Sequence, residues 1–75
     1  MITFEFVATR MEEAINNASR HPSAAQAFMN HADGQLYMAK QAVLLLQEDG
    51  WELNKRLEDA WTNEWAPLFL QIICE

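Results

Sequence analysis

The sequence contains few of the residues on which several classes of small protein depend. Its single cysteine excludes an internal disulfide framework, and its two glycines and two prolines exclude a low-complexity chain. Five lysines and arginines stand against eleven aspartates and glutamates, which gives a formal net charge of −6. With so few cations to neutralise phosphates, the chain is not expected to bind DNA or RNA directly.

The chain also lacks long apolar runs and a basic N-terminal cluster. No run reaches the ~20 residues that span a bilayer, and residues 1–6 include an acid where a secretory signal carries basic side chains. We therefore expect a cytoplasmic protein with no membrane partner, in which Cys74 remains a reduced thiol.

Hydrophobic residues, by contrast, make up 51% of the 75 positions, which is enough for one small domain over residues 1–75. A chain of this length buries only about 60% of its unfolded surface, so its stability is marginal. Small domains compensate with disulfides, metals or oligomerisation. Because internal disulfides are excluded, the sequence favours association of the chain with itself.

The first segment has two interpretations. As a helix ending near Pro22, it places an apolar residue at every third or fourth position. As a strand, residues 2–7 alternate apolar and polar side chains, and a helix would follow from Thr9 with Glu12 closing a capping box. The helix is favoured because no partner strand is evident. Its apolar stripe comprises Phe4, Val7, Met11, Ala14 and Ala18.

The second segment shows the strongest periodicity in the sequence. Ser23, with Gln26 three residues later, is expected to cap a helix that ends near Asp49 and Gly50. Gly34 lies inside the pattern and would weaken or kink the helix. Met38 is interpreted as core filler. The apolar seam, with spacings of three and four that suit packing against another helix, comprises Ala25, Met29, Ala32, Leu36, Ala39, Val43 and Leu46.

A third helix is predicted after the Asp49–Gly50 turn, antiparallel to the second, so that the two form an αα-hairpin. Pro67 either kinks this helix or begins a short fourth one. The predicted fold is all-α, with three or four helices in a bundle that oligomerisation completes. An α+β fold with strands over residues 2–7 and 68–74 is the alternative. The positions expected on the inner face of the third helix are Leu53, Leu57, Ala60, Trp61, Glu64 and Trp65.

The sequence contains no recognisable constellation for catalysis. There is no His-x-x-x-His, Cys-x-x-Cys or Glu-x-x-His pair to hold a metal, no nucleophile motif and no glycine-rich phosphate loop. His31 with Asp33 is the nearest approach to a metal-binding pair, and an unliganded histidine is the simpler interpretation. We therefore predict a protein that is not an enzyme and carries no cofactor or metal.

The acidic residues allow a hypothesis about function. Negative charge along the third helix could imitate DNA and block a nucleic-acid-binding protein, as small acidic inhibitors of phages and plasmids do. Lys55 and Arg56 lie among these acids and weaken the field, so a solvated face is the simpler interpretation. The acids that would carry this alternative function are Glu52, Glu58, Asp59 and Glu64.

The aromatic residues suggest the favoured function. Three tryptophans, four phenylalanines and one tyrosine are a heavy load for a chain of this size, and aromatic side chains are common anchors of protein interfaces. The sequence therefore predicts a small helical adaptor or regulator that binds itself, as a homodimer, and another protein. The expected partner-binding residues are Trp61, Trp65, Phe69 and Ile72, with Leu36 and Val43 from the seam of the second helix.

Overall fold

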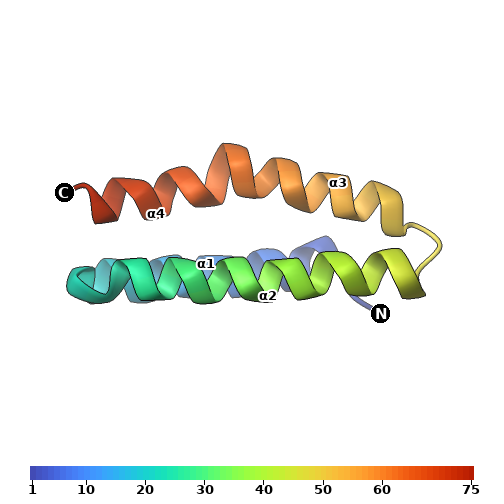
Figure 1. Ribbon diagram of the computed structural model, residues 1–75, viewed down its shortest axis with the longest axis horizontal. Helices are drawn as coiled ribbons and strands as arrows, with labels where there is room; N and C mark the ends of the chain where they lie inside the picture. Colours follow the sequence, from blue (N-terminus) through green and yellow to red (C-terminus); the bar gives the residue numbers. More distant parts are fainter.

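The computed structural model describes all residues 1–75, and its only regular elements are helical. Three antiparallel rods lie side by side, with α1 behind α2 and the third rod above them in Figure 1. The predicted all-α bundle is confirmed, and the α+β alternative is wrong. In chain order the elements are α1 (Phe4–Arg20), the 3-10 turn η1 (Pro22–Ala24), α2 (Ala25–Leu46), α3 (Gly50–Ala60), the π-helical turn η2 (Trp61–Trp65) and α4 (Ala66–Ile73).

The N-terminal residues form a helix because Thr3 caps them. The Thr3 hydroxyl accepts a hydrogen bond from the backbone N–H of Phe6 at 3.1 Å, which satisfies one of the free donors at the helix start. Thr9, the cap expected under the strand interpretation, lies inside α1 and donates to the carbonyl of Glu5. The apolar residues at three- and four-residue spacings then face the other two rods.

The corner between α1 and α2 differs from the expected capping box. Pro22 begins η1, and α2 follows from Ala25 without a side-chain cap from Ser23. The 3-10 turn satisfies the backbone instead, since the N–H of Ala24 donates to the carbonyl of His21. Gly34 does not interrupt α2, which is continuous over 22 residues.

The third rod contains a π-helical turn, which adds one residue to the regular helical spacing and which the sequence pattern did not predict. Buried residues recur on it at Leu53, Leu57 and Ala60, and then after a step of five at Trp65. That step spans η2, where the N–H of Ala66 donates to the carbonyl of Trp61, five residues back. A regular α-helix would place Glu64 in the core after Ala60, and burying an unpaired carboxylate is costly.

The π turn also accommodates Pro67. A proline inside a regular helix lacks an N–H and clashes with the carbonyl four residues earlier. Here the helix widens just before Pro67, so the proline occupies the first turn of α4, where its missing N–H costs little. The rod therefore continues to Ile73 as a helix, and the C-terminal strand of the alternative α+β fold is not formed.

The core runs along the axis of the bundle and holds no buried polar residue. The alanines of α1 and α2 allow these helices to approach closely, and the largest fully buried side chains come from all three rods: Met11, Val43, Leu57 and Phe69. The core residues are Val7, Met11, Ala18, Ala25, Ala32, Leu36, Val43, Leu53, Leu57, Ala60, Trp65 and Phe69.

A side-chain bridge ties the N-terminus to the α2–α3 turn. Gln47 accepts a hydrogen bond from the N–H of Ile2 at 2.7 Å, and its amide donates to the carbonyl of Ile2 at 3.1 Å. The same amide reaches a carboxylate oxygen of Asp49. One glutamine thus fixes both the chain end and the turn.

We expect Gln47→Ala to lower the free energy of unfolding by about 1–2 kcal/mol, because two half-buried backbone groups lose their partner. Urea denaturation followed by circular dichroism measures the loss. Gln71→Ala, at an exposed position of α4, is the control and should change stability by less than about 0.5 kcal/mol. Equal effects of the two substitutions would contradict a structural role for the bridge.

Candidate interaction surface

The six residues expected to bind a partner lie mostly inside the chain's own core. Leu36, Val43, Trp65 and Phe69 are each no more than 4% exposed, so a partner cannot touch them while the bundle is folded. Trp61 and Ile72 are half-buried and pack against the same core. The sequence interpretation placed these side chains on a surface because it underestimated how much of them three helices cover.

Aromatic contacts explain that coverage. The ring of Phe4, from α1, stacks on Trp65 with 5.8 Å between centroids. The guanidinium of Arg56 lies 3.9 Å from the centroid of the Phe4 ring. Trp61 and Phe69 meet in a tilted pair at 6.0 Å. Helix α1 therefore covers apolar surface of the third rod that the sequence had predicted to be covered by a partner chain.

The four acids of the mimicry hypothesis, in contrast, are all on the surface. Glu52, Glu58, Asp59 and Glu64 are exposed along α3 and η2. Lys55 is exposed on the same rod. The four acids do not share one pocket: Glu52 lines a hollow with Asp49 and Arg56, and Glu64 lines a different one with Glu12 and Gln71.

Large apolar side chains remain exposed elsewhere, and none of them is among the six predicted partner-binding residues. Leu45, Leu46 and Trp51 are each about 80% exposed at the α2–α3 end of the bundle. Met38, interpreted as core filler, is 69% exposed, because it lies two residues beyond Leu36 and off the seam. The full set is Met1, Phe6, Tyr37, Met38, Leu45, Leu46, Trp51, Leu68 and Leu70.

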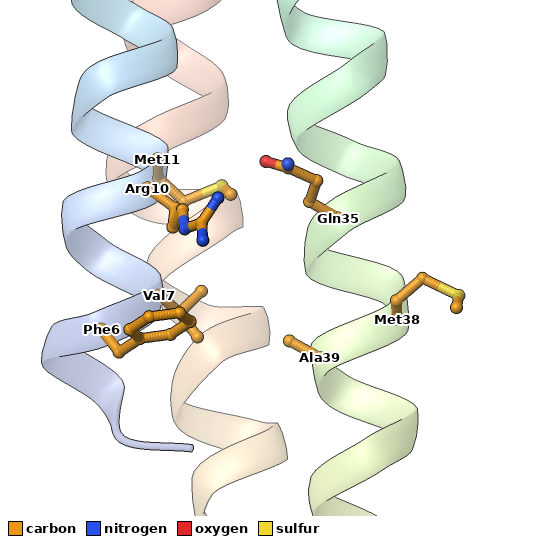
Figure 2. A pocket seen from close by; sticks show the side chains of 7 residues that line it. All are labelled: Phe6, Val7, Arg10, Met11, Gln35, Met38 and Ala39. Atoms are coloured by element: carbon orange, nitrogen blue, oxygen red, sulfur yellow. The ribbon is translucent and has the colours of Figure 1, made fainter. Parts of the chain in front are cut away.

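A groove of about 230 Å³ between α1 and α2 adjoins this exposed surface. Figure 2 shows Phe6 and Arg10 on the α1 side, with Gln35 pointing toward them from α2. The Arg10 guanidinium lies 5.1 Å from the centroid of the Phe6 ring. The other lining residues are Val7, Met11, Met38 and Ala39. Arg10 and Gln35 are the only polar side chains of the lining, so the groove suits apolar contact and lacks an acid–base pair.

No group of three or more histidine, cysteine, aspartate or glutamate side chains is placed to hold a metal ion. His31 and Asp33 are both exposed on α2. None of the helices has the length and apolar character needed to cross a bilayer.

Comparison of the chain with protein-family models, with curated proteins and with solved structures gave no match.

Proposed function

We propose that this chain is a non-enzymatic protein–protein interaction module that forms a homodimer and acts as a small cytoplasmic adaptor or regulator. The observation that supports the proposal is the exposure of nine large apolar side chains on a bundle of only 75 residues. Soluble monomers seldom leave large apolar patches uncovered. Association with protein surfaces removes such side chains from water and stabilises the folded chain.

The surface also supports binding rather than catalysis. The groove between α1 and α2 is lined by five apolar residues with one arginine and one glutamine, and it holds no group suited to be a nucleophile or general base. Aromatic, methionine and arginine side chains are the types enriched at the centre of protein interfaces. Phe6, Arg10 and Met38 provide one of each at this groove.

The proposal predicts association of the pure protein at micromolar concentration, with weak dependence on salt because apolar contacts are not screened. Sedimentation equilibrium at low and high salt measures it. We expect a dimer whose dissociation constant changes by less than about threefold between the two conditions. A monomer at every concentration and salt would contradict the homodimer.

The acidic alternative predicts a different outcome in a parallel experiment. An inhibitor that imitates DNA would bind a basic nucleic-acid-binding protein and release it as salt rises. Glu58→Lys with Asp59→Lys would abolish such binding, whereas it should leave association through apolar contacts unchanged. Strong salt dependence together with sensitivity to these two substitutions would favour the inhibitor.

A further inference from the structure

The outward face of α2 differs in charge from the rest of the molecule. The chain carries a net charge of −6, but the 22 residues of α2 contain only Asp33 and Lys40 as charged side chains. Lys40 is half-buried, and Asp33 is exposed at the border of the outward face, one helical turn before Tyr37. That face consists of Ala27, Asn30, His31, Gly34, Tyr37, Met38, Gln41 and Leu45, all exposed.

The central line of this face is self-complementary in size and polarity. Its six residues, which we call the α2 stripe, follow at spacings of four and three and are Ala27, His31, Gly34, Met38, Gln41 and Leu45. The six residues form three pairs that are symmetric about position 36. Ala27 and Leu45 each lie nine residues from it. His31 and Gln41 each lie five residues from it, and Gly34 and Met38 each lie two residues from it. If the outward faces of two such helices pack antiparallel and cross at the level of Leu36, whose own side chain points into the core, small residues face large ones and polar residues face each other.

We propose that the α2 stripe binds the α2 stripe of a second copy in an antiparallel pair with its twofold axis near Leu36. The proposal rests on the homodimer of the proposed function and names its interface. A twofold interface uses the same patch on both copies, so the patch must complement itself. The residue pairs that meet across the axis are Ala27 with Leu45, His31 with Gln41, and Gly34 with Met38.

The shape of the α2 stripe supports the pairing of Gly34 with Met38 of the second copy. No atom lies within 4 Å of the position a Cβ would occupy on Gly34. The surface is hollowed there, between Asn30, His31, Tyr37 and Met38. In Figure 2 the Met38 side chain extends away from α1, and it is 69% exposed. A methionine from the second copy can therefore enter the hollow over Gly34, since its flexible chain adapts to an irregular gap.

Charge favours a second copy as the occupant. Two chains that each carry −6 repel unless their contact surfaces exclude the acids. The α2 stripe contains no acid, so two copies can meet there without placing like charges opposite each other. A single helix face is smaller than a standard interface, which places the expected dissociation constant in the micromolar range.

Met38→Glu tests the pairing directly. The substitution places one carboxylate of each chain against the hollow of the other, and we expect it to raise the dimer dissociation constant about 100-fold. Met38 is exposed, so the variant should retain its helical circular dichroism. Gln71→Glu adds the same charge on α4, outside the stripe, and should leave the dissociation constant unchanged. A wild-type dimer that Met38→Glu leaves intact would overturn this interface and leave the proposed function standing, whereas a monomeric wild type would contradict both.

Cross-linking tests the orientation independently of that variant. In a Cys74→Ser background, chains with His31→Cys are mixed with chains with Gln41→Cys and treated with a bismaleimide that reaches about 8–10 Å, the separation of packed helix axes. Mass spectrometry should find position 31 joined to position 41 of the other chain. Links of 31 to 31 and 41 to 41 would indicate a parallel pair, and the absence of all links from a dimer would indicate another face; either result overturns the proposal.

Discussion

Replacing Phe69 by alanine is expected to destabilise the fold of the chain strongly, and not merely to dissociate an assembly. Phe69 is 0% exposed and packs against Trp61 and the core of all three rods. Truncating a buried phenylalanine costs about 3–5 kcal/mol, because apolar contact is lost and a cavity remains. A domain of this size has only about 4–11 kcal/mol of stability in total. Urea denaturation followed by tryptophan fluorescence should show a large fall in the midpoint.

Leu70→Ala is the matched control for this prediction. Leu70 is the next residue and 48% exposed, so its truncation should cost less than about 1 kcal/mol. Comparing Phe69→Ala with Leu70→Ala distinguishes two roles for Phe69, a core residue as in the structure or a partner-binding residue as predicted from the sequence. If Phe69 were a docking residue, Phe69→Ala would stay folded at an unchanged midpoint and only the oligomeric state would change. That result would contradict the placement of Phe69 in the core.

The fold was largely predictable because its main signals are local. The α2 seam, for example, follows helical spacing from Ala25 to Val43, and each of its residues is buried or half-buried. Leu46 breaks the rule, since α2 ends there and the third rod begins only after the turn. Whether a seam residue is covered depends on where the neighbouring helix starts, and the spacing of one helix does not contain that information.

The π turn shows a second limit of pattern reading. The spacing predicted both Glu64 and Trp65 on the inner face; the structure buries Trp65 and exposes Glu64, so the prediction for Glu64 is wrong. The alternative registers differ by one residue, and the observed register stacks Trp65 on Phe4 of α1 and leaves the Glu64 carboxylate in solvent. The sequence did contain a hint, because Pro67 requires a distortion of the helix just before it.

The candidate surface was harder to predict than the fold. The apolar excess near the C-terminus suggested docking by Trp61, Trp65, Phe69 and Ile72, but α1 covers that region through long-range contacts. The signal for the α2 stripe was the lack of charge on one face of a long helix. This signal becomes interpretable only when the face is known to point outward.

Gly50→Ala is expected to destabilise the chain by about 3 kcal/mol, although alanine is ordinarily the better helix residue. Gly50 begins α3 at a negative φ, so conformational freedom is not what requires glycine. An added Cβ would overlap the carbonyl oxygen of Val43 and lie 2.7 Å from its carbonyl carbon and 3.0 Å from the Cα of Leu44. These are backbone atoms of α2, which cannot rotate away. The start of α3 must therefore move, and the contacts of Gln47 and Leu53 move with it.

Gly34→Ala is the matched control for Gly50→Ala, because the same substitution is expected to change the stability in the opposite direction. Nothing lies within 4 Å of the Cβ position on Gly34, so alanine there should stabilise α2 by up to about 1 kcal/mol through helix propensity alone. Both variants are measured by urea denaturation at a concentration that keeps the chain monomeric. Because the two substitutions are chemically identical, opposite shifts of the midpoint can arise only from the surroundings. A stabilised Gly50→Ala chain would mean that α3 approaches α2 less closely than this structure shows.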